Sequence, residues 1–245
     1  MTPSAFPFLA APRDGYLFIV TYGRSGSTLT QGLVNAIPGY CIRGENGNLL
    51  HHLARAVAVA DRADNLSWRR EDIARPPEAQ RPFLTGIIGT PADPWYGAEA
   101  IDPDALGRAL ADAFVREVLH PPEGTRVAGF KEIRWHEDAR FFPDFLRIVR
   151  RIFPRARFLF QTRDHEAVAR SKWWGTRPRE AVLAELARAE ALYAAFLAEN
   201  PDCSLLIRYE DYAAGPEAAR RIFDFLGEPF DPDRVAAVLG RTLKH

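Results

Sequence analysis

The six residues from Gly23 to Thr28 have the composition of an anion-binding loop. Gly23 and Gly26 let backbone N–H groups approach a ligand without a Cβ atom in the way, and Arg24 adds a fixed positive charge. The remaining members supply hydroxyl donors: Ser25, Ser27 and Thr28. An apolar run before the loop, residues 17–21, predicts a buried strand, and the apolar spacing after the loop predicts a helix. A strand, a loop of small residues and a helix N-terminus together predict a phosphate site.

The residue order in this loop differs from that of an ordinary ATP-binding P-loop. A Walker A loop has a wider spacing of its two glycines and a lysine before the final Ser or Thr. Here the glycines lie only three positions apart, and Ser27 is the residue before Thr28. A site for magnesium and ATP is therefore not favoured.

A second pair of anion-binding side chains follows a later predicted strand. Arg163 ends the apolar run that begins at Phe158, and Ser171 lies eight positions further on, in the next predicted helix. The guanidinium can hold a phosphate through two parallel hydrogen bonds, and the serine hydroxyl can donate to the same group. The sequence thus predicts a second anion site.

Both segments resemble motifs of the sulfotransferase family. Thr21–Leu29 is similar to the loop that holds the 5′-phosphosulfate of 3′-phosphoadenosine 5′-phosphosulfate (PAPS), and the spacing of Arg163 and Ser171 matches the family's 3′-phosphate motif. The resemblance implies a P-loop-like fold, PAPS as donor, 3′-phosphoadenosine 5′-phosphate (PAP) as product, and no metal. It places the 5′ end on residues 23–28 and the 3′-phosphate on Arg163 and Ser171.

The same resemblance suggests the acceptor. This loop variant, with a glutamate as base, favours the bacterial carbohydrate-sulfating branch, and hence a carbohydrate or glycolipid hydroxyl. A small metabolite and a peptide tyrosine stay open as alternatives.

Sulfuryl transfer needs stabilisation of the leaving phosphate and a base for the acceptor hydroxyl. Arg24 is predicted to stabilise the leaving group electrostatically, since an arginine stays protonated. Glu45 follows a short predicted strand, and the resemblance to carbohydrate-sulfating members makes it the first candidate base. His136 is the alternative base, because its ordinary pKa suits proton transfer near neutral pH. Lys131, at a strand end, is expected to contact the sulfuryl oxygens or the acceptor, or else to pair with a carboxylate.

Two other classes of function share parts of this pattern. A P-loop kinase would need a carboxylate for Mg²⁺ at another strand end, where this chain has Arg163. A nucleotide-binding protein without activity would have no use for both Glu45 and Arg24. A PAPS-dependent sulfotransferase is therefore the favoured prediction, with an ATP-dependent phosphotransferase as the alternative.

Length and charge limit the remaining possibilities. The chain has 245 residues, which fits one α/β domain over residues 1–245. Its 32 basic residues balance 32 acidic ones, so general binding to nucleic acid is not expected. Two cysteines make no disulfide framework. Neither a signal peptide nor a membrane-spanning run is visible, so a cytoplasmic enzyme is expected. The oligomeric state cannot be predicted.

Predicted strands and helices alternate along the chain, which favours a parallel sheet with helices on both faces. The helices expected in the middle of the chain are 48–61, with Asn48 as its capping residue, then 103–119 and 136–152, the last kinked at Pro143. Residues 64–101 are rich in proline and are expected to be irregular and to bind the acceptor.

Aromatic residues and the C-terminus leave several roles open. Trp95 and Tyr96 could stack on a sugar or pack beneath their loop. Trp173 and Trp174 could line the acceptor cleft or join the core, and the core is favoured for at least one of them. Arg241 and Lys244 follow Gly240, and a frayed tail is favoured there over a phosphate contact.

Overall fold

Five parallel strands form the centre of the molecule, as the alternating pattern predicted. The computed structural model describes residues 4–240, and its sheet has the order β2-β3-β1-β4-β5. The strands are β1 (Gly15–Val20), β2 (Tyr40–Arg43), β3 (Val127–Glu132), β4 (Ala156–Thr162) and β5 (Ser204–Arg208). Because all pairings are parallel, the carboxyl ends of the five strands lie along one edge.

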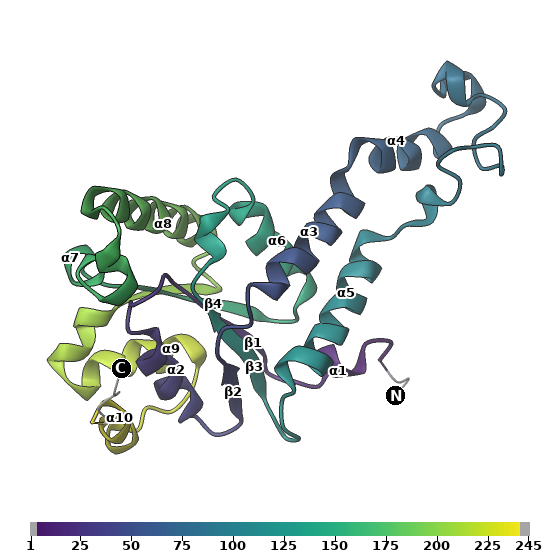
Figure 1. The fold of residues 1–245 in the computed structure, drawn as a ribbon. Coiled ribbons are helices and arrows are strands. Elements are labelled where there is room, and N and C mark those ends of the chain that lie inside the picture. Colours follow the sequence, from purple (N-terminus) through teal and green to yellow (C-terminus); the bar gives the residue numbers. More distant parts are fainter. Residues whose placement is uncertain (1–3, 241–245) are drawn as a thin grey trace.

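Helices cover both faces of this sheet (Figure 1). Those on one face are α3 (Leu49–Arg62), α5 (Pro103–Phe114), α6 (Phe142–Ile152) and α8 (Arg179–Glu199). Those on the other face are α2 (Ser27–Asn35), α9 (Arg220–Leu226) and α10 (Pro232–Leu239). Two shorter helices, α1 (Pro7–Ala10) and α7 (His165–Ala169), lie at the periphery. The predicted fold class is thereby confirmed.

The central strand explains why there are two hydrophobic cores. All six residues of β1 are buried, and its side chains alternate between the faces of the sheet. Phe18 and Val20 join the core with α3, α5, α6 and α8, whereas Leu17 and Ile19 join the core with α2, α9 and α10. A strand buried on both faces reads as a continuous apolar run, which is why the sequence showed it clearly.

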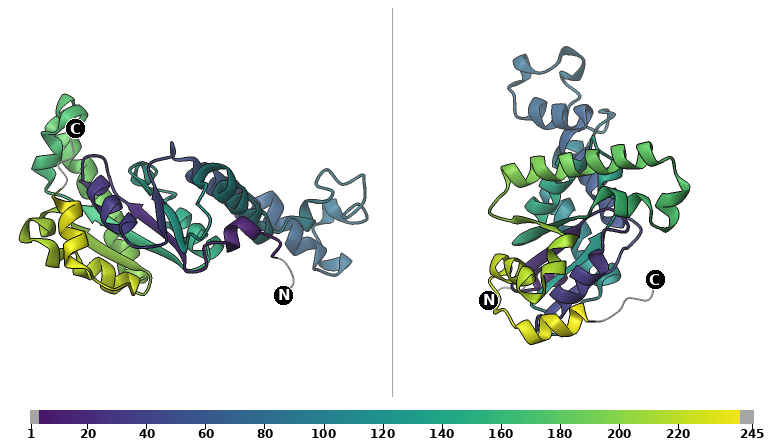
Figure 2. Two further views of the ribbon diagram at one scale, coloured as in Figure 1. Left: turned by 90° about the horizontal axis from the view of Figure 1, so that it is seen from below. Right: turned by 90° about the vertical axis from the view of Figure 1, so that its left-hand side faces the viewer.

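An arm formed by residues 64–101 projects away from the sheet in all three views (Figures 1 and 2). The expectation that it is irregular throughout is wrong at its start, where Asp64–Ile73 forms the helix α4. Arg69 and Asp72 of this helix are buried and form ion pairs with Asp93 and Arg81, and these polar contacts fix the helix although it lacks an apolar stripe. Trp95 and Tyr96 of the arm are exposed.

Two further expectations about helices are corrected. The helix predicted from His136 to Ile152 begins only at Phe142, after a 3₁₀ turn over Trp135–Glu137. Pro143 lies in its first turn, where a proline needs no N–H partner, so it starts the helix and does not kink it. Asn48 precedes α3 as expected, but its side chain does not cap the helix; Asn46 accepts from the N–H of Leu49 instead.

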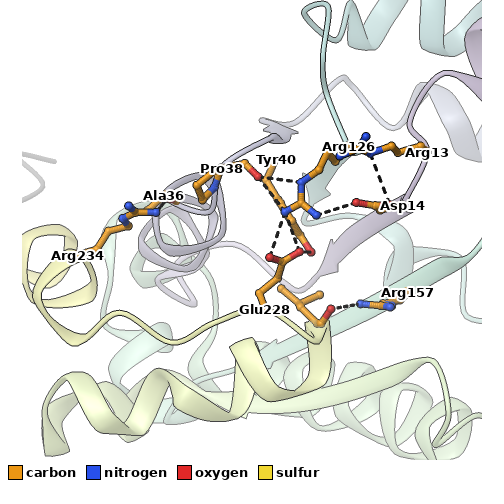
Figure 3. Close-up of polar contacts among 10 residues, drawn as sticks. Arg13, Asp14, Ala36, Pro38, Tyr40, Arg126, Arg157, Glu228 and Arg234 are labelled. Carbon is orange, nitrogen blue, oxygen red and sulfur yellow. Dashed lines mark hydrogen bonds and ion pairs between the residues drawn. The ribbon is translucent and has the colours of Figure 1, made fainter.

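At the amino ends of the strands, Arg126 joins three separate parts of the chain (Figure 3). Its guanidinium donates to Asp14 at 2.7 Å, to Glu228 at 2.9 and 3.1 Å, and to the carbonyl of Pro38 at 3.0 Å. It also lies 5.7 Å from the ring centroid of Tyr40. This cluster ties the lead-in to β1, the turn before β2 and the segment after α9 together, at the end of the sheet opposite the carboxyl edge.

Among the described residues, the structure has no helix with the length and apolar character that crossing a membrane requires.

Candidate functional site

A cavity of about 540 Å³ lies at the carboxyl edge of the sheet. Eight residues predicted from the sequence line it: Gly23, Arg24, Gly26, Ser27, Thr28, Glu45, Lys131 and Arg163. Four more were not predicted to do so: Leu29, Ile133, Tyr209 and Leu239. Trp173, which the sequence left open between cleft and core, also lines the cavity. The carboxyl edge is where open α/β sheets bind ligands, and the loops after all five strands supply lining residues.

The loop from Gly23 to Thr28, called the anion loop here, has the backbone of a phosphate-binding turn. Gly26 has φ +83° and lies against the ring of Tyr209, so a side chain at this position would meet both backbone strain and a clash. Arg24 also lies in the left-handed region, with φ +68°, which is strained for a residue that has a Cβ atom. Among the described residues, no side chain caps the start of α2, and the first residues of the helix, Ser27 and Thr28, line the cavity, so the positive end of the helix dipole lies at the site.

Buried polar residues hold the inner side of this loop. Gln161 of β4 is fully buried, and its amide nitrogen donates to the carbonyl of Ser25 at 2.8 Å. The Thr21 hydroxyl donates to Ser25 Oγ at 2.7 Å. The predicted ligand Ser25 is therefore turned inward, and its side chain anchors the loop in place of lining the cavity.

Arg163 reaches the loop from the end of β4. Its Nη1 atom donates to the carbonyl of Arg24 at 3.0 Å, and its guanidinium carbon lies 4.4 Å from the ring centroid of Tyr209. Buried donors remain without a hydrogen-bond acceptor on both arginines, at Arg24 Nε and Arg163 Nε, within the described part of the chain. Two cationic side chains with donors to spare fit a ligand that carries more than one anionic group.

Glu45 and Lys131 meet across the cavity wall. Lys131 Nζ donates to Glu45 Oε1 at 2.5 Å, and the Lys131 side chain is 9% exposed against 38% for Glu45. Arg43, two residues before Glu45 in the chain, donates to the carbonyls of Leu119 and His120. Glu45 is thus the more exposed of the two side chains, and Lys131 is the buried one.

Glu132, the residue after Lys131, supports the same turn from the interior. Its side chain is almost fully buried and accepts from the backbone N–H groups of Asn48 at 3.1 Å and Ile133 at 2.9 Å. Because successive residues of a strand face opposite sides, Lys131 and Glu132 hold the turn over residues 44–48 from two directions.

His136 and Ser171 lie apart from the described lining of the cavity. His136 is buried, and burial lowers its pKa below the ordinary value; its Nε2 atom is 3.8 Å from Glu185 Oε1. Ser171 donates its hydroxyl to the carbonyl of Val168 at 2.8 Å. Neither side chain reaches the cavity in this conformation.

A family model for sulfotransferases matches residues 17–232, a span that holds every lining residue of the cavity except Leu239. The chain belongs to the sulfotransferase family. The predicted enzyme class, a PAPS-dependent sulfotransferase, is confirmed with this assignment.

Other comparisons add little to the family assignment. No curated protein matches the chain. Among solved structures, one that it resembles is retinol dehydratase in complex with androsterone and the inactive cofactor PAP, with 17% identity and a TM-score of 0.38 over 95% of this chain and 68% of that one.

Some residues of this sulfotransferase site had a readable signal and others had none. Tyr209 is the last residue of the segment from Ser204 that predicts a strand, and Gln161 is a polar residue within an apolar run, so both were detectable in principle. Ile133 and Leu239 are ordinary apolar residues, and only the tertiary structure places them at the cavity. Arg241 and Lys244 lie outside the described residues. Within residues 4–240 no His, Cys, Asp or Glu side chains gather into a group that could hold a metal ion.

Proposed function

We propose that this sulfotransferase transfers a sulfuryl group from PAPS to a hydroxyl of a carbohydrate or glycolipid, with Glu45 as the base. The observation that carries the proposal is that the anion loop, Arg163 and the Glu45–Lys131 pair line one cavity. Donor-binding cations and a half-exposed carboxylate are thereby within one site.

The residues present fit the donor. The loop amides, the start of α2 and the Arg24 side chain would hold the 5′-phosphosulfate, and the buried Nε of Arg163 would serve the 3′-phosphate. Ser171 was predicted to join Arg163, and it would have to release the Val168 carbonyl to do so. PAPS supplies the activated sulfuryl group and a leaving group that needs charge stabilisation. Arg24, Lys131 and the α2 dipole provide positive potential there without a metal.

Glu45 would take the proton of the acceptor hydroxyl. A carboxylate that is 38% exposed at a cavity wall can reach an incoming hydroxyl, whereas the buried His136 cannot without a rearrangement. Lys131 has three N–H donors, so it can keep Glu45 in place while it contacts a sulfuryl oxygen. These contacts favour Glu45 over His136 as the base.

The acceptor is proposed from the chemistry of the cavity wall. Arg24, Glu45 and Lys131 provide charged partners for hydroxyl groups, and polar atoms make up more of the lining than apolar ones. That balance suits a sugar better than a largely apolar acceptor. Acceptor binding by the arm over residues 64–101 stays a prediction, as do a single domain over the whole chain and action in the cytoplasm.

Calorimetric titration with PAP in EDTA, beside ATP and ADP, tests the donor site. We expect binding that depends on the 3′-phosphate, and a large loss of affinity in Arg163→Ala with some transfer retained. Arg170→Ala, in an exposed residue outside the cavity lining, is the matched control and should bind normally. A preference for magnesium and ATP would favour the phosphotransferase instead.

A further inference from the structure

Two adjacent tryptophans have different surroundings beside the anion loop. Trp174 is 1% exposed, and its Nε1 atom donates to the carbonyl of Gly23 at 2.9 Å. Trp173 is 47% exposed and lines the cavity. The two rings are stacked, with centroids 4.3 Å apart and planes inclined by 24°. The buried indole therefore fixes a second indole whose remaining surface faces the site.

Gly23 is shaped to receive the exposed ring. A Cβ atom at Gly23 would lie 2.5 Å from Trp173 Cζ2, so only glycine leaves room for the indole at this point. Arg177 covers Trp174, with its guanidinium carbon 4.9 Å from the ring centroid. Stacking on Trp174 and the close approach of Gly23 hold the Trp173 ring in place, although nearly half of its surface is open.

The two flanks of the anion loop face different parts of the cavity. At Gly26 the neighbouring ring is Tyr209, which stacks on Arg163. Arg163, Tyr209 and Leu239 also line an adjoining hollow of about 520 Å³, which gives the nucleoside end of the donor room to extend. Trp173 lies at the other flank, next to Gly23, and it does not line that hollow. With the donor on the Tyr209 side, the Trp173 side is left for the acceptor.

We propose that Trp173 is the acceptor platform, on which the apolar face of a pyranose ring stacks while Glu45 and Lys131 contact its hydroxyl groups. A rigid aromatic surface with a few charged groups beside it combines apolar area with directional polar contacts. A pyranose has the matching features, since its ring has an apolar C–H face and hydroxyl groups at its edge. This inference rests on the proposed function, since it assumes that the anion loop holds the sulfuryl donor.

The test uses the full-length protein saturated with PAP and two sugar probes, methyl β-D-glucopyranoside and lactose. Saturation-transfer NMR measures which sugar protons contact the protein, and calorimetry measures PAP binding separately. We expect contact with the sugar ring in the wild type. Sugar binding should weaken roughly 3- to 10-fold in Trp173→Leu and remain near normal in Trp173→Phe. The PAP affinity of both variants should be unchanged.

Trp95→Leu tests the rival location, because Trp95 is 43% exposed and belongs to the arm over residues 64–101, for which acceptor binding is also predicted. Loss of sugar binding in Trp95→Leu alone would assign the acceptor to the arm and overturn the proposal. Weaker PAP binding in Trp173→Leu would overturn it too, because the indole would then serve the donor. Normal PAP binding with no sugar contact in the wild type would reject the platform and leave the donor site intact. Absence of PAP binding would instead count against the proposed function itself.

Discussion

Lys131 Nζ lies 2.5 Å from Glu45 Oε1, so the proposed base is held by a residue from the neighbouring strand β3. The sequence left two roles open for Lys131, and this contact shows that pairing with a carboxylate is one of them. Because the ammonium has further donors, the pairing does not prevent contact with a ligand.

Glu45→Gln should abolish most transfer and leave the donor site intact. The amide keeps the shape of the side chain but cannot accept the acceptor's proton, so turnover should fall roughly 10²- to 10⁴-fold. PAP affinity by calorimetry should stay near normal. Full turnover in this variant would shift the assignment of the base to His136, for which His136→Gln is the matching experiment.

Gly23→Ala should disturb the anion loop through Trp173. The added methyl group would lie 2.5 Å from the indole, and overpacking of this kind costs about 1–3 kcal/mol. We expect a lower unfolding midpoint and weaker PAP binding. Adding Trp173→Leu should restore much of both, because the smaller side chain makes room for the methyl group. Additive losses in the double variant would show that the clash does not involve Trp173.

Glu132→Ala should lower turnover more than PAP affinity. Removing this buried carboxylate leaves the N–H groups of Asn48 and Ile133 without their acceptor, at a cost of about 1–3 kcal/mol. The turn that carries Glu45 then loses one of its two supports. Glu132→Gln keeps an acceptor oxygen and should recover part of the turnover. Glu123→Ala, in an exposed turn, should behave as wild type. Equal loss of PAP binding and turnover would contradict a positioning role.

Stability should decrease as the pH falls through the ordinary range of histidine titration. Burial lowers the pKa of His136 in the folded protein, so near pH 6.5 the unfolded chain takes up a proton that the folded protein does not bind. Stability is thus greatest above that pH and declines below it. Burial lowers the pKa of His51 as well, so both histidines contribute. Urea unfolding of the wild type, His136→Gln and His51→Gln across this range should show a flatter dependence in each variant.

Arg126→Met should destabilise the fold without affecting the site. It removes hydrogen bonds to Asp14, Glu228 and Pro38 and leaves the partly buried Glu228 without its cation (Figure 3). A loss of about 1–3 kcal/mol in unfolding free energy is expected. Arg13→Met is the control and should change stability little. Arg13 is 75% exposed, and its ion pair with Asp14 is long at 4.0 Å. Unaltered PAP affinity in both variants would separate stability from binding.

Secondary structure was predictable where local patterns dominate. The apolar runs of β1 and β4 were readable because strands buried on both faces of a sheet are mostly apolar. The anion loop was readable from its small and hydroxyl-bearing residues. The start of α6 and the helix α4 were not, since Pro143 can either begin or kink a helix, and α4 depends on ion pairs with residues distant in sequence. The predicted capping by Asn48 failed in the same way. Its side chain does not cap α3, and its backbone N–H donates to Glu132 of β3, a residue distant in sequence.

The sequence by itself determined the family, the parallel α/β fold and most residues of the anion loop, since these follow from short segments with their own spacing. Only the tertiary structure decided that Lys131 pairs with Glu45, that Ser25 and His136 are turned inward, and that Trp173 faces the cavity while Trp174 does not. These outcomes depend on which strand lies beside which and on the direction of each side chain at a strand end. Local sequence does not encode such contacts, because they form between residues far apart in the chain, such as Gly23 and Trp174, which are 151 positions apart.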